Sequence, residues 1–166
     1  MRVVVVMMMV GSLFGCGGSE EPNPDVYKRA DATKSAAAEV FPLIGEAVKA
    51  SSYTSSGGGR WDICGMEPSP TGAEYVAEVA VTDSNTVASE QADLIASALT
   101  SVGWKVEPPT SELVEASKDG LQFAARYGDL AINLSIRSGC VDSSANSSRK
   151  LSDKRIEDLG LPLSAE

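Results

Sequence analysis

The chain of 166 residues contains no histidine and carries far fewer basic than acidic side chains. Without histidine, two lone cysteines such as Cys64 and Cys140 are too few ligands for a zinc site. Lysine and arginine number 14 against 23 aspartates and glutamates, a formal charge of −9. This balance argues against nucleic acid, which requires basic groups that displace counterions, and against holding anionic lipid by charge alone. We therefore predict no metal, no cofactor and no nucleic-acid partner.

The sequence also has no hydrophobic run long enough to cross a bilayer. Its longest apolar stretch, residues 3–13, has eleven residues, whereas a spanning helix needs about 20. Arg2 precedes this stretch and supplies a positive start. A short positive segment followed by a short apolar one is typical of a secretory signal peptide.

The end of the apolar stretch carries the most specific motif in the chain. Leu13-Phe14-Gly15-Cys16 resembles the bacterial lipobox, in which an aliphatic, a variable and a small residue precede cysteine; Phe14 is bulkier than usual. The resemblance implies that the sulfur of Cys16 receives a diacylglycerol and that residues 1–15 are removed as a lipoprotein signal peptide. The alternative is an ordinary signal with an incidental cysteine. The lipobox interpretation places the protein at the cell membrane, lipid-anchored on the extracytoplasmic face.

The residues after Cys16 predict a flexible tether over residues 16–25. Glycine, serine, glutamate, asparagine and proline dominate this segment, and it offers almost nothing apolar to bury. At about 5–6 Å × √n, such a tether reaches roughly 15–20 Å.

The mature chain predicts an α+β domain over residues 26–142. Helical spacing of apolar residues predicts helices over 26–51 and 86–102; Pro42 either kinks the first helix or begins a second one. Residues 83–86 offer several N-caps for the helix over 86–102, and Gly103 is its expected stop. Alternation predicts strands over 74–82 and within 121–137, with short ones over 104–107 and 60–63. The expected architecture is a two-layer sandwich: an antiparallel sheet of about four strands, with two helices on one face. Residues 143–166 are expected to be a polar C-terminal tail with one turn docked by Leu159 or Leu161.

The segment 121–137 predicts a hairpin with a definite register. Gly128-Asp129 is a two-residue turn signal, and pairing across it leaves apolar residues on one face. The expected pairs are Tyr127 with Leu130, Ala125 with Ile132, Phe123 with Leu134, and Leu121 with Ile136.

Cys64 and Cys140 remain once Cys16 is assigned to lipid. An exported protein occupies an oxidising compartment, where thiols pair. Cys64 precedes the first clear strand and Cys140 follows the last, so their positions can meet in a sheet. The absence of a CxxC motif leaves a reactive thiol as the weaker alternative. We predict a Cys64–Cys140 disulfide.

The remaining candidates for chemistry have simple structural explanations. Residues 147–150 match S-x-x-K, but the other motifs of the penicillin-binding enzymes are missing. Glu74 and Glu78 on one strand lie about 13 Å apart, too far for a glycosidase pair at ~5–9.5 Å. Trp61 and Trp104 are expected to pack in the core near the disulfide. Residues 57–59, three glycines, are expected to be a flexible link. We therefore predict no catalytic residues.

Three stretches of the mature chain together suggest a family: RWDICG over residues 60–65, VGW over 102–104, and SGC over 138–140. With the lipobox, they resemble small actinobacterial membrane lipoproteins of uncharacterised function. The resemblance implies envelope localisation and no established catalytic residues.

The function expected from these features is a non-enzymatic binding or interaction module of the bacterial cell envelope. It would present an unpaired sheet edge or the polar sheet face to an envelope protein or ligand. The alternative is a small envelope enzyme, or an accessory subunit of one, acting on cell-wall polymers; a cleft with converging carboxylates would favour it. Solute capture is a third possibility, although one small domain lacks two-lobed closure.

Overall fold

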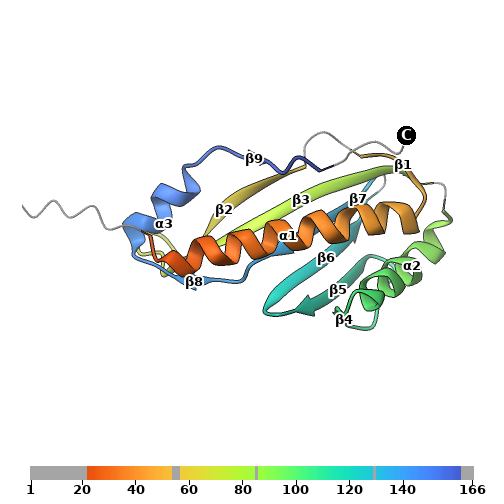
Figure 1. Ribbon diagram of the computed structural model, residues 1–166, viewed down its shortest axis with the longest axis horizontal. Coiled ribbons are helices and arrows are strands. Elements are labelled where there is room, and N and C mark those ends of the chain that lie inside the picture. The colour runs from red at the N-terminus through yellow and green to blue at the C-terminus, as the bar shows by residue number, and fades with distance from the viewer. Residues whose placement is uncertain (1–21, 54–56, 85, 129, 162–166) are drawn as a thin grey trace, which may run out of the picture.

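The computed structural model describes residues 22–53, 57–84, 86–128 and 130–161. These residues form three helices and one sheet (Figure 1). The helices are α1 (Pro24–Ala47), α2 (Ala88–Ser101) and α3 (Ala145–Ser152). The strands are β1 (Ala50–Tyr53), β2 (Gly58–Cys64), β3 (Gly72–Ser84), β4 (Lys105–Val106), β5 (Leu113–Lys118), β6 (Leu121–Tyr127), β7 (Ile132–Arg137), β8 (Val141–Asp142) and β9 (Glu157–Asp158).

The sheet is antiparallel and is built around the long strand β3. Its order is β4-β5-β6-β7-β3-β2-β9, and β1 and β8 pair with the two ends of β3. Helix α1 lies along β3, and α1 and α2 cover the same face of the sheet (Figure 1). The fold class is therefore α+β as predicted. The expectation of about four strands and two helices was too low, because the additional strands are mostly two to four residues long and carry no periodic signal.

Helix α1 begins two residues earlier than expected, so the predicted tether overlaps its first turn. The side chain of Asn23 caps the helix by accepting a hydrogen bond from the Asp25 N–H, and Pro24 occupies the first position, where its missing N–H costs nothing. The helix continues through Pro42 to Ala47, so the interpretation as one continuous element is confirmed. Its buried residues lie at helical spacing on one side of the helix and form a mostly apolar stripe: Val26, Ala30, Thr33, Ala37, Val40, Phe41, Ile44 and Gly45.

The main core lies between α1, α2 and one face of the sheet. Strand β3 supplies Ala77, Val79 and Val81, which share a face as predicted, and α2 supplies Ile95 and Leu99. Every second residue of strands β5, β6 and β7 also packs into this core: Val114, Ala116, Leu121, Phe123, Ala125, Ile132, Leu134 and Ile136. Apolar side chains at every second position of the strands and at about every 3.6 positions of the helices therefore face one another and form one apolar layer.

The expected N-caps of α2 were wrong. The capping position is Val87, which makes no side-chain cap. The hydroxyls of Ser84 and Thr86 instead donate to the Val48 carbonyl at 2.7 and 2.6 Å. These bonds satisfy a carbonyl at the end of α1 that has no partner within the helix. The predicted stop is confirmed, since Gly103 adopts φ +82°, a conformation that glycine tolerates best.

The hairpin formed by β6 and β7 has the predicted faces but a different register. Its loop runs from Gly128 to Ala131, closed by the Gly128 N–H donating to the Ala131 carbonyl at 2.9 Å. The pairs are Tyr127 with Ile132, Ala125 with Leu134 and Phe123 with Ile136. A shift of two residues keeps every side chain on its face, so alternation alone does not select the register. Leu130, placed in the core by the predicted turn, is 89% exposed.

The segment expected to be a polar tail is packed over the part that the structure describes. Helix α3 is capped by Ser144, whose hydroxyl accepts from the Ser147 N–H. Its Leu151 is 1% exposed and packs with Val26 of α1 and Ala73 of β3 in a second, smaller core. Leu159 and Leu161 pack against the main core, so both residues expected to dock do so. The folded unit thus extends beyond residue 142.

Candidate functional site

The disulfide predicted from the sequence is confirmed. Cys64 ends β2 and Cys140 lies just before β8, with the two Cα atoms 6.0 Å apart. The bond closes a loop with a sequence separation of 76. It ties the β2–β3 connection to the chain that leads into α3. Cys16, the predicted lipidation residue, lies outside the residues that the structure describes.

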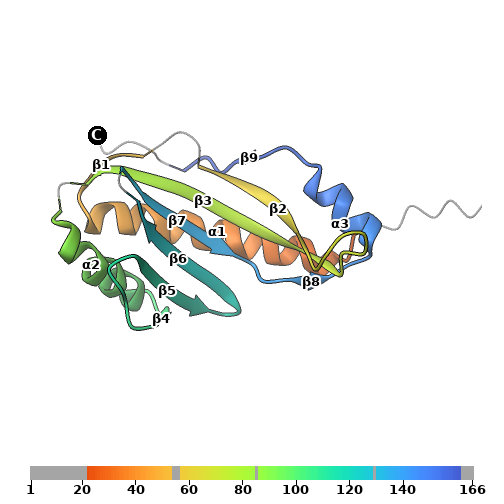
Figure 2. The ribbon, with the colours of Figure 1, turned by 180° about the vertical axis from the view of Figure 1, so that it is seen from behind.

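The face of the sheet opposite the helices is open over β3, β6 and β7 (Figure 2). It contains a hollow of about 480 Å³, called here the sheet hollow. Its floor carries the short side chains of Ala80, Ala124 and Ser135. Longer polar side chains line the same hollow: Glu78, Glu115, Gln122, Arg126, Asn133 and Arg137. Small residues at the centre and long ones around them make this part of the sheet concave.

The charged groups nearest β3 on this face are paired with one another. Arg137 donates to Glu74 at 2.5 Å, and Arg60 donates to Glu78 and to Asp62. The hydrogen bond to Glu78 is the main cause that raises the pKa of the Arg60 guanidinium. Val76 is fully buried because its cross-strand neighbours are these two arginines, whose apolar stems can cover it.

The groups at the other side of the sheet hollow are available to a partner. Arg126 and Glu115 are exposed, and neither forms a salt bridge with another described residue. Gln122 and Asn133, also exposed, each offer an amide that both donates and accepts. The sheet hollow therefore suits a polar partner with groups of both signs.

A second concave surface lies on the helix side of the molecule. It has a volume of about 430 Å³ and runs between α1, β2 and the chain from α3 to β9; we call it the aromatic groove. Trp61 and Gly59 of β2 line it beside Tyr27 of α1. Trp61 meets Tyr27 and Tyr75 edge to face, with ring centroids 5.9 and 5.0 Å apart. The charged residues lining the groove are Asp31, Lys34, Lys154, Arg155 and Glu157.

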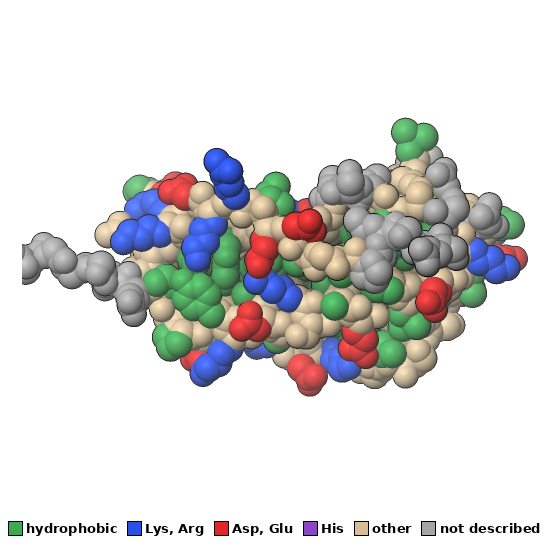
Figure 3. All heavy atoms as spheres, turned by 45° about the horizontal axis from the view of Figure 1, so that its top comes forward, with side chains coloured by type: hydrophobic (Ala, Val, Ile, Leu, Met, Phe, Trp, Pro, Cys, Tyr) green, Lys and Arg blue, Asp and Glu red, His purple; other side chains and the backbone are tan. Residues whose placement is uncertain are grey.

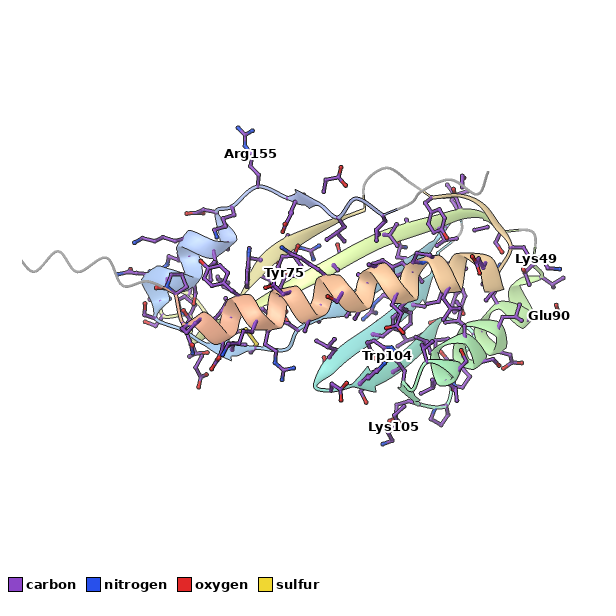
Figure 4. All side chains as sticks on the ribbon, in the orientation of Figure 1. Lys49, Tyr75, Glu90, Trp104, Lys105 and Arg155 are labelled. Atoms are coloured by element: carbon purple, nitrogen blue, oxygen red, sulfur yellow. A yellow bond between two sulfur atoms is a disulfide. The ribbon has the colours of Figure 1, made fainter. Side chains whose placement is uncertain are left out.

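A buried tyrosine joins the aromatic groove to β9. Tyr75, which lies between α1 and the sheet (Figure 4), donates to the Glu157 carboxylate at 2.8 Å. Burial, followed by this hydrogen bond, raises the pKa of the Tyr75 hydroxyl. Lys34 also donates to Glu157 at 2.8 Å. Only glycine fits at position 59, because a Cβ there would lie 1.6 Å from the Tyr75 hydroxyl oxygen. The expectation that residues 57–59 form a flexible link was wrong for Gly58 and Gly59, which belong to β2.

Glu157 predicts a pH dependence of stability. The hydrogen bond from Lys34 is the main cause that lowers its carboxyl pKa below the ordinary 4.5. A carboxyl with a lowered folded-state pKa contributes stability above its unfolded pKa and loses it as the pH falls through the folded value. Because the side chain is 48% exposed, solvent limits the effect to about 0.5 kcal/mol.

The measurement is urea unfolding of Glu157→Gln and wild type across pH 7 to about pH 3. We expect the wild type to be more stable at neutral pH and the difference to close below pH 4.5. Glu90→Gln is the matched control, since Glu90 is exposed and remote on α2 (Figure 4). A difference that stays constant over this range would contradict the role assigned to the Glu157 charge.

The other sequence candidates fall in separate places. Trp104 is buried as expected and meets Phe123 edge to face, whereas Trp61 is only partly buried and lines the aromatic groove. In the S-x-x-K match, Ser147 is buried beside Ser144 while Lys150 is exposed. The groove itself was not foreseen, because its residues come from three segments that are far apart in the sequence, from Tyr27 to Glu157. The one available signal was the cluster of Arg149, Lys150, Lys154 and Arg155 in an acidic chain.

Within the described ranges, no group of three or more aspartate, glutamate, cysteine or histidine side chains could hold a metal ion. Among the helices that the structure describes, none is both long and apolar enough to cross a membrane.

Comparison with known proteins gives one weak structural likeness. No protein-family model matches the chain, and no curated protein sequence matches it. A solved structure of a DUF4853 family protein from Actinomyces odontolyticus ATCC 17982 matches 85% of this chain and 76% of that chain, with a TM-score of 0.46 and 12% sequence identity. A likeness at this level establishes neither a shared family nor a function.

Proposed function

We propose that this protein is an extracytoplasmic lipoprotein, anchored to the cell membrane through Cys16, whose α+β domain is a non-enzymatic binding module of the bacterial envelope. The address is supported by the positive start, the short apolar stretch and the lipobox-like residues 13–16. The Cys64–Cys140 disulfide also supports it, because such bonds persist in oxidising compartments.

The observation that carries the binding role is the sheet hollow. An uncovered sheet face with a concave centre and exposed amide and charged side chains can receive a polar ligand or a protein loop. Arg126 and Gln122 supply donors, and Glu115 supplies an acceptor. The hollow lies on the face away from α1, so a partner can reach it without moving a helix.

The alternative, an envelope enzyme acting on wall polymers, needs a carboxylate that is free to exchange a proton. On the open face, Glu74 and Glu78 are each held by an arginine, Arg137 and Arg60. Such pairing occupies acceptor oxygens of both carboxylates with arginine donors. Glu115 is the carboxylate of the hollow without a salt-bridge partner among the described residues. Because glycoside hydrolysis uses a pair of carboxyl groups, this arrangement favours binding over acid–base catalysis of wall polymers.

Site-specific crosslinking in intact cells tests the binding role. We expect a photoreactive amino acid at Gln122, in the sheet hollow, to capture a discrete partner, and the same group at Glu90 on α2 to capture none. Ala124→Trp fills the floor of the hollow and should abolish the crosslink from position 122, since a tryptophan side chain occupies the space that the partner needs. Crosslinks of equal yield from both positions, or an Ala124→Trp variant that still captures the partner, would contradict the assignment.

A further inference from the structure

The starting observation is a basic and aromatic surface at one end of an acidic molecule. Arg149, Lys150, Lys154 and Arg155 fall within seven residues that contain a single acidic residue, Asp153. Two of these basic residues line the aromatic groove together with two aromatic side chains, and the four form what we call the basic-aromatic face: Lys154, Arg155, Tyr27 and Trp61. Figure 3 shows hydrophobic side chains gathered beside the start of the described chain, with lysine and arginine side chains around them.

The basic residues of this face are not held in salt bridges by other described side chains. Lys154 and Arg155 have no salt-bridge partner among the described residues. Arg155 points away from the body of the domain into solvent (Figure 4). Glu157 is paired with Lys34, and Asp31 is the other carboxylate that lines the groove. The groove is thus lined by three cations, Lys34, Lys154 and Arg155, and by two carboxylates, a positive balance in a chain that is negative as a whole.

The same face presents side chains that favour the boundary between water and lipid. Tyr27 is 39% exposed, and the Lys154 ammonium lies 5.1 Å from the centre of its ring. Tyrosine and tryptophan concentrate at membrane interfaces because each combines an apolar ring with a polar group.

The position of the predicted anchor places this face near the membrane. The chain enters the domain at the start of α1 (Figure 1), next to α3 and Trp61. From Cys16 to Pro24 there are eight residues, which span at most about 28 Å when fully extended. The opposite end of α1 is about 36 Å farther along the helix axis. Lipid at Cys16 would therefore hold the basic-aromatic face, rather than the end that carries α2, within reach of headgroups.

We propose that the basic-aromatic face binds the anionic lipid headgroups of the membrane in which Cys16 is anchored; this inference rests on the proposed function. Each lysine or arginine near an anionic surface is attracted to it, and a lipid anchor combined with a basic patch is a recognised pair of membrane signals. The groove lies on the helix side of the sheet and the sheet hollow on the other side. Contact through the basic-aromatic face therefore leaves the sheet hollow turned toward solvent, where a partner can enter it.

The two tryptophans provide the test. The purified full lipoprotein is reconstituted in phosphatidylcholine vesicles with and without phosphatidylglycerol, each containing a brominated lipid that quenches tryptophan emission. Trp104→Phe leaves Trp61 as the reporter, and Trp61→Phe leaves the buried Trp104 as its control. We expect quenching of Trp61 only with phosphatidylglycerol, its loss at high salt because charge attraction is screened, and no quenching of Trp104.

Matched charge reversals locate the contact. Lys154→Glu with Arg155→Glu should abolish the quenching of Trp61. Lys49→Glu with Lys105→Glu, which changes the net charge equally at exposed positions near α2 and outside the face (Figure 4), should leave it intact. Circular dichroism checks that both variants fold.

Flotation of the vesicles separates this inference from the proposed function. Protein that floats with both vesicle types while Trp61 stays unquenched would overturn the lipid contact and leave the anchor standing. Protein that floats with neither would overturn both. Quenching that occurs without phosphatidylglycerol, or that is unchanged in Lys154→Glu with Arg155→Glu, would also overturn the lipid contact. A response of Trp61 to soluble peptidoglycan fragments instead of phosphatidylglycerol would assign the groove to a glycan.

Discussion

Replacing both Cys64 and Cys140 by serine should lower the free energy of unfolding by about 4.5 kcal/mol. The reason is that the disulfide closes a loop with a sequence separation of 76, and the chain-entropy estimate for such a loop gives about this value. Single domains are stable by only about 5–15 kcal/mol, so the loss is a large part of the total. Urea unfolding of oxidised wild type and of the double variant measures it.

Reduced wild type is the control for packing defects caused by serine. Thiol reduction should shift the urea midpoint of the wild type to that of the double variant and leave the variant unchanged. We also expect the largest local effect near β8 and α3, because Cys140 leads directly into them and the bond fixes that segment beside β2. Equal midpoints for the oxidised and reduced wild type would show that the disulfide adds nothing to stability.

Replacing Cys16 by alanine should abolish attachment to the membrane. The proposed anchor is covalent, and no other described feature can substitute for it: the domain is acidic overall, and a basic patch alone binds lipid only weakly and reversibly. In cells fed a clickable fatty acid, the wild type should carry the label and remain in the membrane fraction after a high-salt wash. The Cys16→Ala variant should carry no label and should be absent from the membrane fraction.

The other two cysteines supply the matched control for this experiment. A Cys64→Ala, Cys140→Ala variant should keep the label, because neither position follows a lipobox-like sequence. A wild type without label would remove the proposed address, and with it the orientation inferred for the basic-aromatic face. Label in the Cys16→Ala variant would place the lipid on a different residue.

Several elements could be predicted because their signals are local. The stripe of α1 from Val26 to Ile44 and the alternation of Tyr75, Ala77, Val79 and Val81 each follow from spacing along a few neighbouring residues. The stop at Gly103 follows from a conformation that glycine adopts most readily. The Cys64–Cys140 disulfide was predicted by combining an expected oxidising compartment with the positions of both cysteines beside strands.

Other features required contacts that local pattern does not contain. Two registers of the β6–β7 hairpin have the same faces, and only the loop from Gly128 to Ala131 distinguishes them. Short strands such as β9 exist because Gly58 and Gly59 pair with Asp158 and Glu157, about 100 residues away. The hydroxyls of Ser84 and Thr86 cap the end of α1 instead of the start of α2, since the Val48 carbonyl lies within reach only in the folded chain.

By itself, the sequence determined the fold class and the apolar faces of the main helices and strands, because periodicity acts between near neighbours. It also determined the pairing of Cys64 with Cys140, because few cysteines are present and both flank predicted strands. The tertiary structure alone decided where the two concave surfaces lie. The sheet hollow exists because short side chains from β3, β6 and β7 fall side by side, and the aromatic groove because Trp61, Tyr27 and Lys154 meet across three segments. Such juxtapositions depend on which distant segments pack together, and that choice is made by the whole core rather than by any stretch of residues.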